Sequence, residues 1–503
     1  MAGDLQQRKS SIPVTLEKKR HSLFSSVAPL LALAMLLLFC GCQAASQGAG
    51  HPVSRPELNA TADGDRDGAR LSLFLSLKTP ATRGVRMDVS RIEILADTSW
   101  LPVSLQPIEI DAATLGGGQL FLGRCLLPAN RYQRLRFTIS QGSMLHNNGE
   151  RIFLALDSPT VEVNLPGGGL ALEHGDSHSL FITWGEEESL QAPPILRPAL
   201  SIAPRLKQMV ADLAYVACPE IDTVYVIRTD KNWVCDSLSV SGGPTCLAVD
   251  TNGSRKRLFI LTTREAAIKV VELPTNNIVD SFAIPMTPKP AFMAVNPAGS
   301  MAYVLDAEGG YLLRMNLETG TLEARVRLGY QPDYVTYIAD QNLLAVASSL
   351  SQSVFLIDPA TLASTGTIST GQTPRGMAAL NDLLYIAESD TNSVSIYDLN
   401  NQSLRSRLSV GFAPRRIIQH DNQIYISNHG SDSISILQPE QLSIAREIAL
   451  NGHPLEMAVE QNRKWLYVGN ESIGGLTVVD ASINRVAGEI LFGATPMGID
   501  VIE

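Results

Sequence analysis

A repeat of about 42 residues fills the second half of the chain, and it constrains the fold more than any other feature of the sequence. A turn that ends in proline recurs seven times, and successive prolines lie 46, 42, 42, 40, 40 and 42 residues apart. The seven prolines are Pro244, Pro290, Pro332, Pro374, Pro414, Pro454 and Pro496. Repetition at this period indicates that one small structural unit is copied seven times along the chain.

Each repeat unit carries four short strands. In one unit, an inner strand starts at Pro374, an apolar strand covers residues 384–387, and two more strands cover 393–398 and 404–411. Seven such units over residues 206–503 predict a seven-bladed β-propeller. An open solenoid, the alternative, would need capping repeats at its ends, and the sequence has none.

The phase of the repeat predicts how the propeller closes. The first unit begins with its second strand, at Leu213, and the chain ends with an unpaired inner strand at residues 497–502. We expect these segments to join in one blade, three strands from the start and one from the end. Such 3+1 closure removes the exposed sheet edges that would otherwise favour aggregation.

The propeller units resemble a known family. The Asn-containing turn at 388–393, the strand Val-Ser-Ile-Tyr-Asp at 394–398, and the segment Val-Asn-Pro-Ala-Gly-Ser-Met-Ala-Tyr-Val at 295–304 are similar to repeats of the YVTN family of seven-bladed propellers. The resemblance covers the whole second half of the chain. It implies the fold but no single activity, because propellers serve many roles.

Residues 70–205 show a different pattern, in which apolar and polar residues alternate within short runs. Turn residues such as Gly116-Gly117-Gly118 separate these runs, so the region predicts an antiparallel β-sandwich. Residues 100–103 and 127–132 resemble a β-sandwich family of unknown function that is common in bacterial lipoproteins, which implies a fold and a location. We expect the acidic triplet at 186–188 to be a solvated loop.

The N-terminus predicts export. The basic cluster at 18–20 is followed by an apolar run at 27–40, too short to span a bilayer of about 30 Å but typical of a signal peptide. The run ends in Phe-Cys-Gly-Cys, which resembles the bacterial lipobox, so residues 1–41 are the expected signal peptide and Cys42 the expected lipidation site. An ordinary cleaved signal peptide is the alternative. Residues 42–69 are rich in small and polar residues and predict a flexible spacer.

The lipobox resemblance and the charge bear on location and partners. Gln43 stands where aspartate would favour the inner membrane, so the resemblance implies the outer membrane of a Gram-negative bacterium. The formal net charge of −10 argues against nucleic acid as a partner. Without residues 1–41, the chain keeps 35 Lys and Arg against 48 Asp and Glu. We therefore expect the lipid anchor to hold it at the membrane.

Cysteine spacing bears on metals and cofactors. Outside the signal, the cysteines are Cys125, Cys218, Cys235 and Cys246. The sequence leaves two alternatives. An exported compartment permits disulfides, so two of the last three cysteines could form one. Alternatively, all four cysteines are buried free thiols. The mature chain has no Cys-x-x-Cys and no Cys-x-x-Cys-His, so we expect neither a metal site nor a bound cofactor.

The repeat also predicts where a ligand would bind. The residues that follow the prolines should surround the mouth of the central channel: Thr245, Ala291, Asp333, Arg375, Arg415, Leu455 and Met497. Arg375 and Arg415 on neighbouring blades could hold a carboxylate or phosphate. Arg416 and Glu456, one position further on, are further ligand candidates, or else they pair to join two blades. His429 is a loop candidate that would need a carboxylate such as Asp432 or Glu388 for catalysis.

Together these features predict a non-enzymatic binding scaffold of the cell envelope, whose protein or small-molecule partner the sequence does not identify. A hydrolase is the alternative, because residues 467–471 resemble a strand-end motif of seven-bladed bacterial lactonases. An electron-transfer role is a third possibility. The sequence contains neither the Gly-x-Ser-x-Gly nucleophile motif nor a phosphate-binding loop.

Overall fold

The computed structural model describes residues 68–146, 149–192, 194–203, 212–250, 256–273, 275–462 and 464–502. The expected signal peptide, Cys42 and nearly all of the expected spacer lie outside these ranges. Among the helices within them, none is both long enough and apolar enough to traverse a bilayer.

The N-terminal domain is a β-sandwich of two sheets. Its elements are β1 (Ala69–Leu77), β2 (Arg86–Ala96), β3 (Ser99–Ser104), β4 (Ile108–Asp111), α2 (Ala112–Leu115), β5 (Gln119–Leu127), β6 (Asn130–Leu145), β7 (Arg151–Leu156), β8 (Thr160–Asn164), β9 (Leu170–Leu172), β10 (Ser177–Gly185), β11 (Leu190–Gln191), β12 (Ile195–Leu196) and β13 (Ala199–Ile202). One sheet has the order β13-β10-β1-β5, and the other contains nine strands built around β2 and β6. Inward residues such as Leu73, Ile94, Phe137 and Trp184 form the core between them.

The sandwich departs from the sequence-based prediction in two places. The pairs β1–β10 and β7–β12 are parallel, whereas the other paired strands are antiparallel. Such long-range pairings leave no turn signature in the sequence. In the acidic triplet, Glu186 is fully buried and accepts hydrogen bonds from the backbone N–H groups of Thr82 and Val85, at 2.6 and 2.9 Å. Only Glu187 and Glu188 are exposed, as a solvated loop would be.

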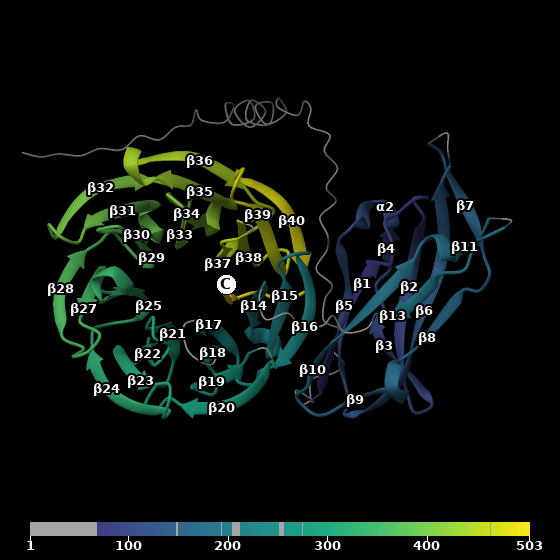
Figure 1. The fold of residues 1–503 in the computed structure, drawn as a ribbon, viewed down its shortest axis with the longest axis horizontal. Helices are drawn as coiled ribbons and strands as arrows, with labels where there is room; N and C mark the ends of the chain where they lie inside the picture. Colours follow the sequence, from purple (N-terminus) through teal and green to yellow (C-terminus); the bar gives the residue numbers. More distant parts are fainter. Residues whose placement is uncertain are drawn as a thin grey trace, which may run out of the picture. The chain divides into compact units, whose positions relative to one another are not determined.

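The second half of the chain forms seven four-stranded antiparallel sheets, which confirms the predicted propeller. Blades 1 to 3 contain β14 (Leu213–Cys218), β15 (Thr223–Arg228) and β16 (Trp233–Ser239); β17 (Pro244–Asp250), β18 (Arg257–Thr262), β19 (Ala267–Glu272) and β20 (Asn277–Ala283); and β21 (Pro290–Val295), β22 (Met301–Asp306), β23 (Tyr311–Asn316) and β24 (Thr321–Arg327). Figure 1 shows the sheets around a common centre, with β17 and β21 among the innermost strands and β16, β20 and β24 at the rim.

The remaining blades repeat this plan. Blades 4 and 5 contain β25 (Pro332–Ile338), β26 (Leu343–Ser348), β27 (Ser353–Ile357) and β28 (Ser364–Ser369), then β29 (Pro374–Leu380), β30 (Leu383–Glu388), β31 (Ser393–Asp398) and β32 (Ser403–Ser409). Blades 6 and 7 contain β33 (Pro414–His420), β34 (Gln423–Asn428), β35 (Ser433–Gln438) and β36 (Ser443–Ala449), then β37 (Pro454–Glu460), β38 (Trp465–Asn470), β39 (Gly475–Asp480) and β40 (Arg485–Leu491). Six inner strands therefore begin at a repeat proline.

Short loops position the mouth of the propeller. The turn between the second and third strands ends, in every blade, in a residue with positive φ: Asp222, Ala266, Gly310, Gln352, Asn392, Asp432 and Gly474. This left-handed residue reverses the chain, and only two of the seven are glycine. These turns lie on the same face as the start of each inner strand, because Pro374 is opposite Glu388 and Pro414 is opposite Asn428. We call this face the mouth face.

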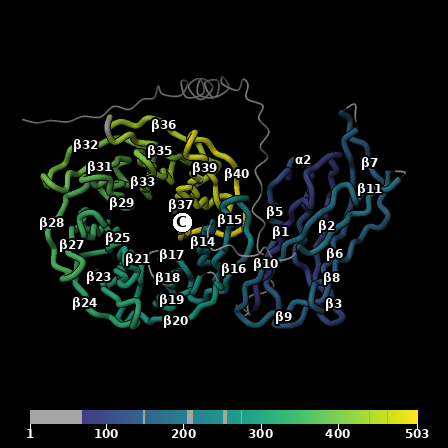
Figure 2. Tube along the Cα trace, in the orientation of Figure 1, coloured from purple at the N-terminus to yellow at the C-terminus, as the bar shows by residue number. Residues whose placement is uncertain are grey.

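The ring closes as the sequence predicts. The last strand, β41 (Gly498–Ile502), pairs antiparallel with β14, with Leu213 opposite Ile502. Figure 2 traces the C-terminus to the centre of the ring, near β14 and β37. Closure thus pairs residues almost 300 positions apart and completes blade 1.

The sandwich contacts the blade at which the ring closes. Arg124 of β5 donates hydrogen bonds to the backbone carbonyls of Phe492 and Gly493, at 3.2 and 2.9 Å, in the loop that leads to β41. Phe74 of the sandwich lies in one buried cluster with Tyr225 of blade 1, with ring centroids 6.2 Å apart. These contacts tie the closing segment to the N-terminal domain.

The four cysteines within the described ranges are free and buried. Burial raises the pKa of the Cys125, Cys235 and Cys246 thiols to about 12. Of the two alternatives that the sequence leaves open, the structure therefore has the buried thiols and contains no disulfide among Cys218, Cys235 and Cys246.

Candidate functional site

Two ion pairs and one histidine–carboxylate contact on the mouth face join residues at the same place in consecutive repeats. They are Asp333 with Arg375 at 3.7 Å, Arg416 with Glu456 at 2.8 Å, and His429 with Glu471 at 3.3 Å. The partners are 42, 40 and 42 residues apart in the sequence. Opposite charges one repeat apart are thus brought together by neighbouring blades, and this spacing is a signal that sequence alone can provide.

Arg416 lies across the centre of the propeller. It comes from β33 in blade 6, yet its guanidinium carbon is 5.2 Å from the ring centre of Phe292 in blade 3 and 4.7 Å from that of Tyr334 in blade 4. Its Nε donates a hydrogen bond to Glu456 of blade 7. We call Arg416, Glu456, Phe292 and Tyr334 the plug, because they occupy the channel behind the mouth.

The plug is electrostatically satisfied. Burial lowers the pKa of Arg416, but its interactions with Glu456, Tyr334 and Cys246 together outweigh burial, so the net shift is upward. The side chains of Arg416 and Glu456 are only 13% and 12% exposed. Their geometry favours the alternative in which the pair joins blades rather than binding a ligand.

Asp333 and Arg375 line the mouth in front of the plug. Their 3.7 Å contact is an ion pair without a hydrogen bond, and Asp333 Oδ2 is buried with no hydrogen-bond partner in the described part of the chain. The Arg375 side chain is 41% exposed. Arg375 is therefore only loosely held and can turn towards a ligand.

Arg415 differs from the other charged residues of the mouth. The residues at its repeat position in the adjacent blades are Arg375 and Leu455, so neither equivalent residue carries an opposite charge. Burial lowers the pKa of Arg415 to about 10, and the guanidiniums of Arg416 and Arg375 add to this effect, while Glu456 and Glu471 oppose it. Within the described ranges, its side chain forms no hydrogen bond and no ion pair.

His429 belongs to a pair of stacked histidines. Its ring lies 5.1 Å from that of His453, and its Nε2 is 3.3 Å from Glu471 Oε2. Asp432, one of the two carboxylates that the sequence suggested for His429, instead lies 2.6 Å from His453 Nδ1. The other, Glu388, is fully buried and bound elsewhere in blade 5. The turn carrying His429 faces the next blade, which explains the change of partner.

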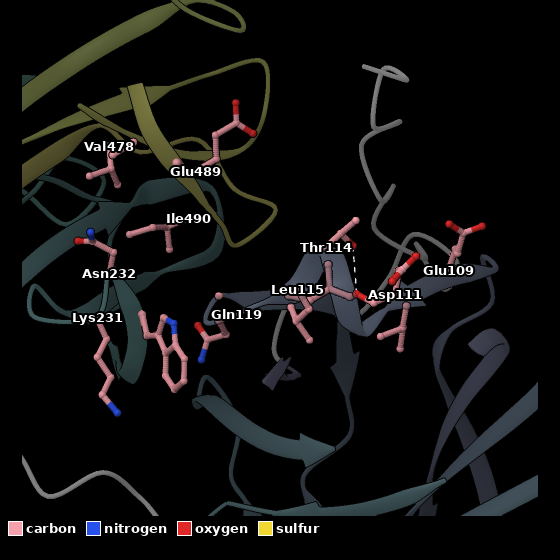
Figure 3. Close-up of a pocket in the computed structure, with 16 residues that line it drawn as sticks. Glu109, Asp111, Thr114, Leu115, Gln119, Lys231, Asn232, Val478, Glu489 and Ile490 are labelled. Carbon is pink, nitrogen blue, oxygen red and sulfur yellow. Dashed lines mark hydrogen bonds between the residues drawn. The ribbon is translucent and has the colours of Figure 1, made fainter. Parts of the chain in front are cut away.

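A cavity of about 440 Å³ lies where α2 and β5 approach blades 1 and 7 (Figure 3). Several of its polar side chains are already engaged. Asp111 lies 2.5 Å from Arg151, and Gln119 forms two hydrogen bonds with the backbone of Val234, at 3.1 and 3.0 Å. Asn232 accepts a hydrogen bond from the Tyr467 hydroxyl. We therefore place the candidate site at the propeller mouth and not in this cavity.

Sequence reasoning missed three features of the mouth face: the partnership of His453 with Asp432, Glu388 as a buried hydrogen-bond acceptor, and Asp306, which is buried with neither carboxylate oxygen bonded in the described ranges. The turn residues at these positions carried no signal, because Asp and Asn are common turn formers. Across the same ranges, no group of three or more His, Cys, Asp and Glu side chains is arranged to hold a metal ion.

Comparisons with known proteins bear on the fold alone. No family model matches the chain, and no curated protein matches it. A functionally unknown protein from Desulfotomaculum acetoxidans is 14% identical, with a TM-score of 0.52, over 58% of this chain and 99% of that one. Hydrazine synthase from Kuenenia stuttgartiensis is 16% identical over 52% and 89% of the two chains, with a TM-score of 0.46.

A dihydro-heme d1 dehydrogenase is 12% identical over 57% of this chain and 65% of that chain, with a TM-score of 0.44. At such low identity, similarity of fold carries no activity from one protein to another. The chain is thus an all-β protein with a β-sandwich followed by a seven-bladed β-propeller.

Proposed function

We propose that the protein is a lipid-anchored binding scaffold of the bacterial cell envelope, in which a YVTN-like propeller holds an anionic group at its mouth. The unpaired guanidinium of Arg415 carries the proposal. A partly buried cation whose guanidinium has no hydrogen bond and no ion pair is unfavourable, and a bound anion would relieve that penalty. Arg375 lies on the adjacent blade and would supply a second set of donors.

The ligand chemistry follows from these two residues. Arginine offers planar, paired N–H donors that match the two oxygens of a carboxylate or phosphate. The plug behind the mouth would limit how deep a ligand can reach. The proposed ligand therefore presents its anionic group at the surface of the propeller and does not pass through the channel.

Anion binding can be tested by isothermal titration of the chain from residue 43 onward with succinate and with inorganic phosphate. We expect at least one to bind, and Arg415→Met to weaken that binding about tenfold or more, since a charged hydrogen bond contributes about 1.5–3 kcal/mol. Arg327→Met, at an exposed site on the outer strand β24, is the matched control. If neither anion binds, or if Arg415→Met binds equally well, the proposal is wrong.

The membrane anchor is a separate part of the proposal. We expect Cys42 to carry the lipid and the protein to reside in the outer membrane of a Gram-negative bacterium. In such a host, Cys42→Ser should move the protein from the membrane fraction to the soluble fraction, while the matched variant Cys40→Ser should leave it in the membrane. Retention of the Cys42→Ser protein would exclude this anchor.

A lactonase-like hydrolase is the second candidate function. The observation in its favour is that His429 and His453 each lie against a carboxylate on the mouth face, at 3.3 and 2.6 Å, an arrangement that suits a general base. Proton release from gluconolactone should then be detectable and should disappear in Glu471→Gln. Absence of turnover in the unmodified protein would remove this candidate.

A further inference from the structure

The mouth face exposes several large apolar side chains. Met286, Tyr330, Leu350 and Phe412 are between 65% and 70% exposed, and all four lie in loops on this face. On the loops of the opposite face, the described residues include a single exposed large hydrophobic residue, Ile483. Exposed apolar groups concentrated on one face indicate an interaction surface.

These side chains lie in loops that are tied down. Tyr330 and Phe412 each precede an inner-strand proline by two residues, in blades 4 and 6. The backbone of Phe412 accepts a hydrogen bond from Gly430 N–H at 2.9 Å and donates one to Ser431 Oγ at 3.0 Å. The carbonyl of Tyr330 accepts a hydrogen bond from Ser348 Oγ. The loops are thus held in place while their aromatic rings face solvent.

The aromatic residues flank the guanidiniums. Arg375 belongs to blade 5, between the blades that carry Tyr330 and Phe412, and Arg415 follows Phe412 by three residues. A small anion bound at the two arginines would leave both rings exposed. A ligand that covers the whole surface must carry a negative group with apolar groups on either side of it.

The composition of the surface favours a protein partner. Tyrosine, phenylalanine, methionine and arginine are the residues enriched at the centres of protein interfaces. The surrounding loops carry Glu308, Asp390 and Glu471 beside Arg264 and Lys289, so the face is not the uniformly basic patch that an anionic membrane surface attracts. A polypeptide segment can place one carboxylate at the arginines and keep its remaining charge away from these acids.

We propose that the mouth face docks an extended segment of a partner protein, with an acidic side chain between Arg375 and Arg415 and apolar side chains over Tyr330 and Phe412. This inference rests on the proposed anion site, because the same arginines receive the acidic group. It adds the class of ligand and the two aromatic residues that select it.

The test is selection from a displayed library of random peptides on the chain from residue 43 onward. We expect the selected peptides to share an acidic residue with apolar neighbours, and to bind the double variant Tyr330→Ser, Phe412→Ser at least about tenfold more weakly. Ile483→Ser, on the opposite face, is the control and should bind normally. Both substituted sites are exposed, so the variants should melt at the temperature of the unmodified protein.

The outcomes separate the two proposals. Suppose that binding of succinate or phosphate requires Arg415. If no peptide is then selected, or if the selected peptides bind the double variant equally well, the docking inference is wrong and the anion site stands. If neither small anion binds, the proposed function fails as well. Binding of phosphatidylglycerol vesicles that is lost in the double variant would show that the face recognises a lipid surface, which would also overturn the inference.

Discussion

Two acidic residues at the same place in the repeat have opposite environments. Glu388 ends the second strand of blade 5 and Asp306 ends that of blade 3, and both are buried. Glu388 accepts hydrogen bonds from Gly371 N–H, Ser393 and Ser395, at 2.7, 2.7 and 2.6 Å. Both carboxylate oxygens of Asp306 lack a hydrogen-bond partner in the described part of the chain.

The neighbouring strands explain the difference. Where blade 5 has Ser393 and Ser395 on its third strand, blade 3 has Tyr311 and Leu313, which donate no hydrogen bond to Asp306. The fourth strand adds Arg407 Nε at 3.0 Å from Glu388 in blade 5. The equivalent arginine of blade 3, Arg325, lies instead over the ring of Tyr311.

The loop before the inner strand differs as well. It spans residues 370–373 in blade 5, where Gly371 donates to Glu388, but residues 284–289 in blade 3. The comparison shows that a repeat position does not determine the state of a buried charge. The donors that surround it do, and these come from three other segments of the blade.

The largest expected effect is at Glu388. Glu388→Ala should lower the free energy of unfolding by about 3–5 kcal/mol, because it leaves a partly buried amide, two buried hydroxyls and Arg407 without their acceptor. Urea-induced unfolding followed by circular dichroism would measure the loss. Glu308→Ala, at an exposed turn residue of blade 3, should change stability by less than about 0.5 kcal/mol. Equal effects of the two variants would mean that the Glu388 contacts contribute nothing.

A substitution at Asp306 should change the free energy of unfolding in the opposite direction. Asp306→Asn should raise the free energy of unfolding by about 1–2 kcal/mol, because a buried carboxylate without hydrogen bonds is unfavourable and the amide carries no charge. The same unfolding assay applies. A loss of stability on this substitution would show that Asp306 has a favourable partner that remains to be identified.

A smaller contrast concerns the tyrosines of the second strands. The hydroxyl of Tyr467 donates to Asn232 Oδ1 of the adjacent blade at 2.6 Å, whereas the Tyr385 hydroxyl has no hydrogen-bond partner in the described ranges. Tyr467→Phe should therefore destabilise the protein by about 1 kcal/mol, and Tyr385→Phe should not destabilise it. Thermal unfolding of both variants would measure the difference. Similar losses would contradict the assignment of the interblade hydrogen bond.

Arg415 is a partly buried cation whose side chain has no hydrogen bond in the described part of the chain, and we expect it to make anion binding and stability depend on pH. Its pKa is lowered to about 10, so anion binding at the mouth should weaken as the pH rises through about 10. Because the unfolded chain keeps its proton to higher pH, Arg415 destabilises the fold below pH 10, and this contribution declines above it. Measuring the affinity for succinate at intervals between about pH 8 and about pH 11 would test this prediction. Binding that stays constant over the range would show that Arg415 keeps its proton and would contradict its lowered pKa.

Much of the fold could be predicted from the sequence because consecutive repeat units form adjacent blades. The prolines indicated where six inner strands start, and the unpaired strands at the two ends of the repeat indicated 3+1 closure. The pair Arg416–Glu456 could be anticipated for the same reason, since equal positions in consecutive units face each other. The parallel pairing of β1 with β10 could not, because no repeat or turn relates those strands.

The sequence by itself determined the number of blades, their order and the closure of the ring, because burial of the central strands imposes a pattern that recurs in every unit. Only the tertiary structure decided which charges are satisfied. It brought Arg416 across the channel to Phe292 and Tyr334, left Arg415 between Arg375 and Leu455, and buried Asp306 away from donors. Apart from pairs one repeat apart, such as Arg416 with Glu456, hydrogen bonds and ion pairs depend on ångström-scale geometry among several blades, and the periodicity of the chain does not encode that geometry.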